Sequence, residues 1–129
     1  GDADIVHYLK EVRKHAGLMV PGPAQAAGVV ALNDVEGVKV QAQVYRRRLE
    51  RTAQVLSKWS GRTIDLPAGG FYLWFDATDG WEFAERLATE GGALVSPGDF
   101  YGAGGSNNVR VAVVQPDDRI ELLAQRLGL

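Results

Sequence analysis

The spacing of apolar residues in the first part of the chain predicts helices. Near the amino terminus they fall three and four positions apart, behind Asp2 and Asp4 and ahead of Gly17. One helix is therefore expected there, capped by one of the two aspartates and ended by the glycine. Pro23 suits the first position of a second helix, which runs through many small residues from 24 to 32. Small side chains allow close approach of another backbone, which favours a buried or interface helix.

The third predicted helix is long. Asn33 and Glu36 are placed for a capping box at its start, and Gly61 stands at its end. A helix over these positions spans about 36 Å, which is longer than a domain of this size needs and indicates a bridge between two domains. Its apolar positions alternate spacings of four and three, as in a heptad pattern: Val38, Ala42, Tyr45, Leu49, Thr52, Leu56 and Trp59.

The pattern changes in the second half of the chain to short apolar runs separated by turns. Strands are expected at 71–75, 93–96 and 109–114, which are rich in aromatic or β-branched residues. Helices are expected behind the capping residues Asp79 and Asp118. The order strand, helix, strand, loop, strand, helix predicts an α+β fold. N-terminal helices, one of them long, are followed by a small sandwich-like α/β unit around a short three-stranded sheet.

Composition narrows the possible functions. The chain has 129 residues, 46% of them hydrophobic and 23% charged, which is enough for one globular domain. The formal net charge of −2 provides no field that would attract nucleic acid or an anionic membrane. No run reaches the ~18 apolar residues of a membrane span, and the amino terminus lacks a signal-peptide pattern. We therefore expect a cytoplasmic protein that binds neither nucleic acid nor membrane.

Few residues carry recognisable chemistry. The chain has no cysteine, which excludes disulfides, thiolate zinc sites and a cysteine nucleophile. The glycine-rich segment 100–108 does not match a P-loop and predicts a connection before a strand. The arginines at 46–48 fan around a helix and predict a solvated face. A Schiff-base lysine needs a desolvated cofactor pocket, whereas all four lysines fall at polar positions of predicted helices: Lys10, Lys14, Lys39 and Lys58.

Arg110 is the most informative single residue. It stands inside the predicted strand 109–114, which has apolar residues on both faces. An unpaired buried guanidinium is very costly, so an anionic partner is expected, and the planar fork of arginine suits a carboxylate. The partner is either an aspartate or glutamate of the chain or a bound ligand. The remaining alternative is a strand end that leaves Arg110 in water.

Several segments together carry a family resemblance. In order along the chain they are 69–74, 95–102 and 109–112, with the expected helices between them. They resemble the C-terminal part of class I/II, fold type I aminotransferases, which depend on pyridoxal 5'-phosphate (PLP). The strings 13–25 and 45–48 are most similar to those of actinobacterial N-succinyldiaminopimelate aminotransferases. The resemblance covers essentially the whole chain.

The resemblance implies a role for Arg110. It occupies the position of the arginine that binds the α-carboxylate of the substrate. In the family, the Schiff-base lysine and the PLP ligands lie upstream of the segments present here. No catalytic residue, cofactor ligand or metal site is therefore expected in this chain, and the chain alone is expected to be inactive and free of PLP.

The resemblance also implies the properties of a parent protein. It is expected to be a homodimer that transfers an amino group between an amino acid and a 2-oxo acid, of the N-succinyl-LL-diaminopimelate/glutamate type of lysine biosynthesis. Residues 1–34 would end its large, PLP-binding domain, 35–61 would form a linking helix, and 62–129 would form its small domain. Two alternatives stay open: a fold type I PLP enzyme of other chemistry, such as a C–S lyase, and a non-catalytic carboxylate-binding domain.

Overall fold

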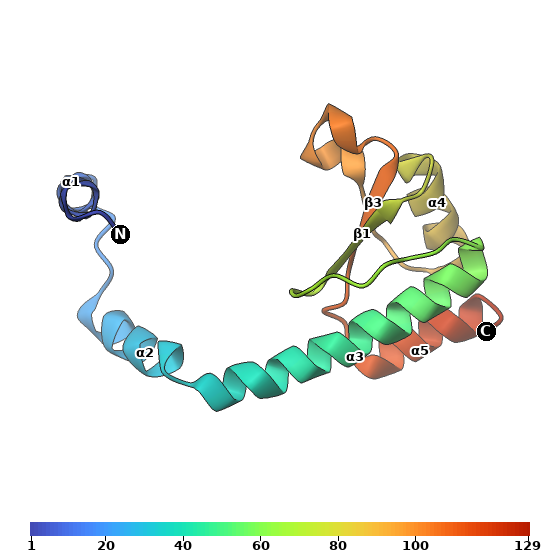
Figure 1. Cartoon of the computed structure of the whole chain (residues 1–129), viewed down its shortest axis with the longest axis horizontal. Coiled ribbons are helices and arrows are strands. Elements are labelled where there is room, and N and C mark those ends of the chain that lie inside the picture. The colour runs from blue at the N-terminus through green and yellow to red at the C-terminus, as the bar shows by residue number, and fades with distance from the viewer. The chain divides into compact units, whose positions relative to one another are not determined.

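The computed structural model describes all residues from 1 to 129 and contains five α-helices and three short strands (Figure 1). This confirms the predicted α+β fold. The chain divides into two compact units, Gly1–Val38 and Lys39–Leu129. The elements in order are α1 (Ala3–His15), α2 (Gly22–Leu32), α3 (Val35–Ser60), β1 (Tyr72–Asp76), α4 (Gly80–Gly91), β2 (Ser96–Pro97), β3 (Asn108–Ala112) and α5 (Asp117–Arg126).

The first unit consists of α1, α2 and the start of α3. Asp2 caps α1, because its carboxylate accepts hydrogen bonds from the backbone N–H groups of Asp4 and Ile5. The helix ends before Gly17, whose φ of 73° is in the left-handed region. Neither α1 nor α2 has a buried residue. This unit by itself therefore leaves the apolar positions of both helices exposed, including the small-residue helix for which burial is expected.

The start of α3 differs from the predicted capping box. The Asp34 carboxylate, at 2.8 Å, accepts the hydrogen bond of the Gly37 N–H, so Asp34 performs the role expected of Asn33. The Asn33 amide instead donates to the Val29 carbonyl at the end of α2. Two capping residues stand side by side in the sequence here, and their partners in space decide which helix end each one serves.

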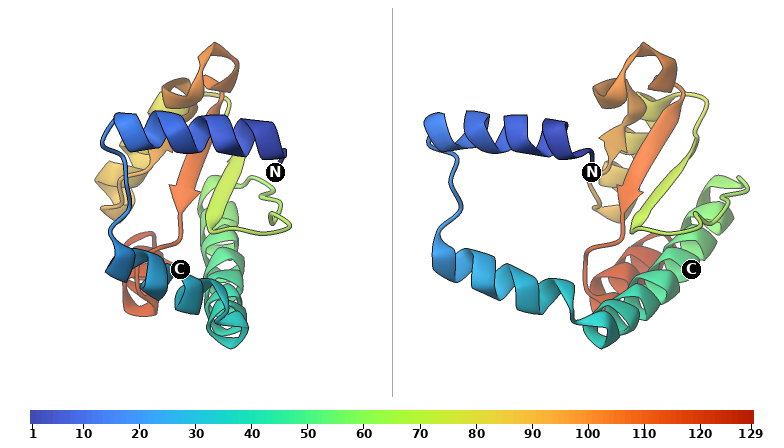
Figure 2. Two further views of the ribbon diagram at one scale, coloured as in Figure 1. Left: turned by 90° about the vertical axis from the view of Figure 1, so that its left-hand side faces the viewer. Right: turned by 60° about the vertical axis from the view of Figure 1, so that its left-hand side comes forward.

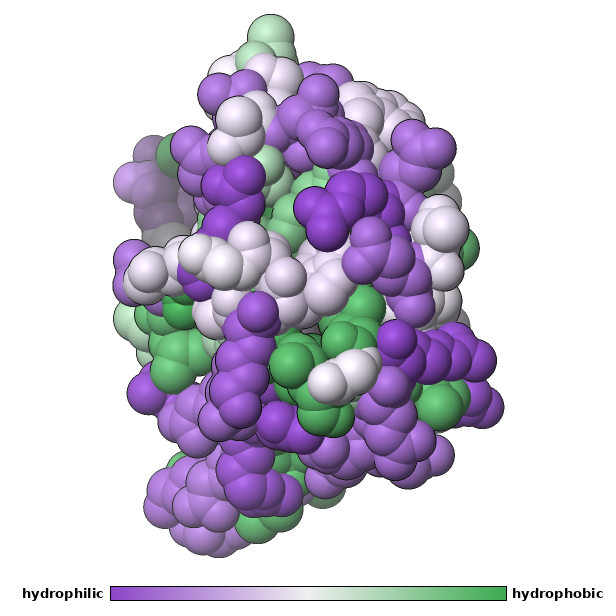
Figure 3. All heavy atoms as spheres, turned by 90° about the vertical axis from the view of Figure 1, so that its right-hand side faces the viewer, coloured by the Kyte–Doolittle hydropathy of each residue, from purple (hydrophilic) through white to green (hydrophobic).

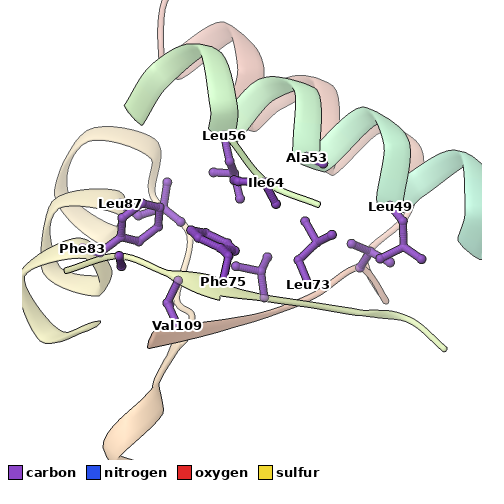
Figure 4. Packing of buried hydrophobic residues seen from close by; sticks show 12 residues of the cluster. Leu49, Ala53, Leu56, Ile64, Leu73, Phe75, Phe83, Leu87 and Val109 are labelled. Carbon is purple, nitrogen blue, oxygen red and sulfur yellow. The ribbon is translucent and has the colours of Figure 1, made fainter. Parts of the chain in front are cut away.

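The second unit is built on a three-stranded antiparallel sheet with strand order β1–β3–β2. One face of the sheet carries Leu73, Phe75, Val109 and Val111, which are buried against residues of α3 and α4 (Figure 4). The predicted strand at 93–96 is observed as the two-residue strand β2, which pairs with β3 through Ser96 and Pro97. Removing this apolar face from water supplies the main stabilisation of the unit.

The helices of the second unit cover that one face of the sheet. Asp79 caps α4 as predicted, and Gly92 ends it with a φ of 69°. The last helix begins at Asp117, with Pro116 at the cap position, so the cap predicted at Asp118 is wrong by two residues. Pro116 cannot donate a backbone hydrogen bond and suits a helix start for that reason. Seen from the side of α4, the surface is mostly hydrophilic with separate apolar areas (Figure 3).

Ion pairs tie α5 to α3, and the two helices run side by side (Figures 1 and 2). Arg48 donates to Asp117 at 2.6 Å. Arg51 binds both carboxylate oxygens of Glu121, at 2.7 and 2.6 Å. The arginine-rich segment of α3 therefore lies at a helix–helix contact rather than on a fully solvated face. No helix of the structure has the length and apolarity needed to cross a membrane.

The Glu121 pair makes a testable contribution to acid stability. The hydrogen bond from Arg51 lowers the pKa of Glu121 from its ordinary value of 4.5. A carboxyl group whose pKa is lowered by folding stabilises the protein above its unfolded pKa, and this contribution is lost as the pH falls through the folded pKa. We expect Glu121→Gln to flatten the loss of stability below about pH 4.5. Urea denaturation of wild type and Glu121→Gln between pH 3 and pH 7 measures the free energy of unfolding at each pH. The same dependence on pH in both proteins would contradict a stabilising role for the Arg51–Glu121 pair.

Candidate carboxylate-binding site

Arg110 lies on the face of the sheet opposite the core. Its β3 neighbours Val109 and Val111 are buried among core residues, and side chains alternate along a strand, so the side chain of Arg110 belongs to the other face. Cross-strand pairing places Trp74 of β1 on one side of Arg110 and Ser96 of β2 on the other. Apolar residues do occur on both faces of this strand, since Ala112 shares the face of Arg110, but only the face of Val109 and Val111 is buried in the core.

The partners of Arg110 are aromatic rings rather than a carboxylate. Its guanidinium carbon lies 4.4 Å from the ring centroid of Tyr72 and 4.6 Å from that of Tyr101. No aspartate or glutamate of the chain forms an ion pair with it, and its buried Nε has no hydrogen-bond partner. The strand position does not leave the residue in open water, since it is partly buried. Of the three alternatives raised by the sequence, a ligand carboxylate is the one these contacts favour.

Tyr101 comes to this face through two short 3₁₀ turns, η1 (Gly98–Tyr101) and η2 (Ala103–Gly105). The turns pack against each other closely: a Cβ on Gly98 would overlap the carbonyl oxygen of Gly105, and a Cβ on Gly105 would lie 2.5 Å from that of Gly98. The second substituent would also meet the Trp74 ring at 3.3 Å. The two glycines therefore allow the loop to close down onto the sheet.

Aromatic contacts and one hydrogen bond hold the loop in place. The Tyr101 ring packs edge-on against Trp74, with centroids 5.7 Å apart. The neighbouring Phe100 packs in the same way against Trp81 of α4, at 5.4 Å. The Trp81 indole N–H also donates to the Asp99 carboxylate at 2.9 Å. The segment 100–108, expected to be a simple connection, thus packs against the sheet and α4.

This arrangement can bind a carboxylate through Arg110. The rings attract the cation without accepting its in-plane N–H groups. No side chain of the structure neutralises the guanidinium, so a ligand carboxylate can form two parallel charge-assisted hydrogen bonds with it. Sequence reasoning finds Arg110 but misses both tyrosines as its partners. Tyr72 has a weak signal, because it shares strand parity with Trp74, whereas Tyr101 sits in a loop without periodicity.

The lysines stand apart from this chemistry. All four are exposed, on α1 and α3: Lys10, Lys14, Lys39 and Lys58. None has the desolvated surroundings that a Schiff-base lysine needs. The residues of this chain therefore do not fit a site that holds PLP covalently.

Comparison with known proteins identifies the family of this chain. The family model for aminotransferase class I and II matches residues 1–127. The chain belongs to the class I and II aminotransferases, which confirms the resemblance seen in the sequence.

Relatives of this chain come from several bacteria. A probable aminotransferase of Mycobacterium tuberculosis is 40% identical over 98% of this chain and 30% of its own length. The 4-dedimethylamino-4-oxo-anhydrotetracycline transaminase OxyQ of Streptomyces rimosus is 43% identical over 98% of this chain and 35% of its own length. An LL-diaminopimelate aminotransferase of Aquifex aeolicus is 32% identical over 98% of this chain and 34% of its own length. The chain spans about a third of the length of these curated relatives.

A solved structure shares the fold. The N-succinyldiaminopimelate aminotransferase of Mycobacterium tuberculosis matches with a TM-score of 0.81 and 21% identity, over 99% of this chain and 35% of that protein. At this level of identity the similarity establishes the fold of the matched region and leaves its substrate open.

Proposed function

We propose that this chain is the C-terminal part of a PLP-dependent aminotransferase, in which Arg110 binds the α-carboxylate of the amino acid and of the 2-oxo acid. The observation that carries this proposal is the guanidinium of Arg110, which two rings hold and no acidic side chain neutralises. Both substrates of a transamination carry a carboxylate beside the reacting carbon. One arginine on a rigid strand can therefore orient either of them in turn.

The family match covers residues 1–127, and the relatives are about three times as long as this chain. Both observations support the following assignment of residues to domains of the parent protein. Residues 1–34 would complete the large, PLP-binding domain, 35–61 would link the domains, and 62–129 would form the small domain that carries Arg110. The exposed apolar positions of α1 and α2 support a parent in which other parts of a homodimer cover them.

PLP supplies the electron sink of aminotransferase chemistry. Because none of the four lysines of this chain fits a covalent PLP site, we assign the cofactor to the remainder of the parent. The chain alone would bind carboxylates weakly and would catalyse no amino transfer. A borohydride-trapped PLP adduct at one lysine of the isolated chain, detected by intact mass, would contradict this assignment.

For the substrate we propose the N-succinyl-LL-diaminopimelate/glutamate pair of lysine biosynthesis. The relatives named as LL-diaminopimelate aminotransferases support this choice, as does the similarity of the strings 13–25 and 45–48 to actinobacterial N-succinyldiaminopimelate aminotransferases. A second candidate substrate is 4-dedimethylamino-4-oxo-anhydrotetracycline or a similar oxo compound, favoured by the 43% identity to the transaminase named for that compound.

The test is a substrate screen of the full-length protein with PLP. Amino donors, including N-succinyl-LL-diaminopimelate, are incubated with 2-oxoglutarate, and mass spectrometry follows formation of glutamate and of the new keto compound. Equimolar formation of both products supports a transaminase. Release of ammonia and a thiol from cysteine-type substrates would identify a lyase, and carboxylate binding without turnover of any donor would identify a binding domain.

A further inference from the structure

The two tyrosines beside Arg110 come from separate parts of the unit. Tyr72 belongs to β1, next to β3 in the sheet, whereas Tyr101 belongs to the loop turn η1. The guanidinium carbon lies at nearly the same distance from both rings, 4.4 and 4.6 Å. Arg110 is the only side chain of the structure that contacts two rings in this way, since the other cation–ring contact, Arg86 with Trp59, involves one ring.

The ordinary way to order a partly buried arginine is an acidic side chain. Two other partly buried arginines of this unit show it: Arg48 pairs with Asp117 and Arg51 with Glu121. An acidic side chain occupies the N–H donors of the arginine and neutralises its charge. At Arg110, such a partner would compete with a ligand carboxylate. A ring attracts the cation through its electron-rich face and leaves those donors free.

We propose that Tyr72 and Tyr101 are positioning residues that hold the Arg110 guanidinium in the orientation that receives the substrate carboxylate. They lower the conformational freedom that Arg110 would otherwise lose on binding, and they do so without competing for its N–H groups. That the tyrosines hold Arg110 for a substrate carboxylate rests on the proposed function. Their contacts with the guanidinium do not depend on it.

The loop helps to position Arg110 because it packs against the sheet. Tyr101 reaches Arg110 because Gly98 and Gly105 bring the two turns into backbone contact and because its ring rests on Trp74. Phe100, the preceding residue, has its ring on Trp81 and does not contact Arg110. The chain thus offers a matched control: two adjacent aromatic side chains of one turn, of which only one touches the guanidinium.

The first measurement is made on this chain and needs no activity. The order parameter of the Arg110 Nε–H bond is obtained by ¹⁵N relaxation for wild type, Tyr72→Leu, Tyr101→Leu, the matching Tyr→Phe variants and Phe100→Leu. We expect the order parameter to fall in both leucine variants at positions 72 and 101. It should stay at the wild-type value in the phenylalanine variants, which keep the ring. Phe100→Leu removes the loop contact with Trp81 but leaves both rings on Arg110, so it should lower the order parameter less than Tyr101→Leu does. An unchanged order parameter in folded Tyr72→Leu and Tyr101→Leu would overturn the proposal.

The second measurement is steady-state kinetics of the full-length enzyme carrying the same substitutions. We expect KM for the amino acid and for the 2-oxo acid to rise about 5- to 30-fold in Tyr72→Leu and in Tyr101→Leu, and less in Phe100→Leu, with a much smaller change in kcat, because ground-state and transition-state binding weaken together. Tyr→Phe should restore KM to within about threefold of wild type. A fall in kcat with unchanged KM would contradict positioning.

The two measurements separate the two hypotheses. If the wild-type enzyme transfers no amino group from any donor, the proposed function fails, while the order parameters still decide whether the tyrosines hold Arg110. If one leucine variant does not fold, as judged by its amide spectrum, the other variant and the two phenylalanine variants decide the outcome.

Discussion

Replacing Arg110 by alanine in the full-length aminotransferase is expected to lower kcat/KM for both substrates about 10²- to 10³-fold, because removing one partner of a hydrogen-bonded charge pair costs about 2–5 kcal/mol. Arg110→Lys should recover only part of this loss. Lysine keeps the positive charge but lacks the planar fork that binds both carboxylate oxygens. Initial rates over a range of each substrate measure the effect.

Arg119→Ala is the control for this experiment. Arg119 is exposed on α5, away from the sheet face that carries Arg110, and it forms no ion pair in the structure. Its removal should leave kcat/KM within about twofold, as for a surface charge with little energetic role. Equal losses of kcat/KM in Arg110→Ala and Arg119→Ala would show that positive charge in general is required. Full activity of Arg110→Lys would show that the bidentate geometry of arginine is not required.

The largest expected effect on stability comes from the core face of the sheet. Leu73, the second residue of β1, is 0% exposed and points toward α3 (Figure 4). Leu73→Ala removes buried apolar atoms and leaves a cavity between two rigid elements, so we expect a loss of about 2–5 kcal/mol in the free energy of unfolding. Urea denaturation followed by circular dichroism measures it.

Leu94→Ala makes the same chemical change outside the core. Leu94 is 92% exposed in the link between α4 and β2. The expected change in the free energy of unfolding is below about 0.5 kcal/mol. If Leu73→Ala were no more destabilising than Leu94→Ala, the packing of β1 against α3 would be contradicted.

Element types were predictable because they depend on local periodicity. The three- and four-residue spacing of α3 and the aromatic run of β1 are periodic in the sequence, and both elements occur where expected. Element ends were less predictable. Asp34 rather than Asn33 caps α3, α5 begins at Asp117, and the strand expected at 93–96 shortens to β2. Each of these ends depends on partners that are distant in sequence or on competition between adjacent residues.

The candidate site shows the same division. The sequence alone marked Arg110 as an arginine within an apolar strand, and the family motifs implied its carboxylate role. It did not reveal which face the side chain occupies, because a run of valines around one arginine does not indicate whether one or both faces of a strand are buried. The antiparallel register and the single layer of helices decided that.

The sequence by itself therefore determined the order and type of the elements, the α+β class and the family, and it singled out the arginine for which a carboxylate ligand is proposed, since these depend on local pattern and residue chemistry. Only the tertiary structure decided what surrounds Arg110. Tyr72 arrives through strand pairing and Tyr101 through a loop that two glycines allow to close. Tyr72 and Tyr101 lie 38 and 9 positions before Arg110 in the sequence. These separations match no helix or strand period, so only the tertiary fold brings the three residues together.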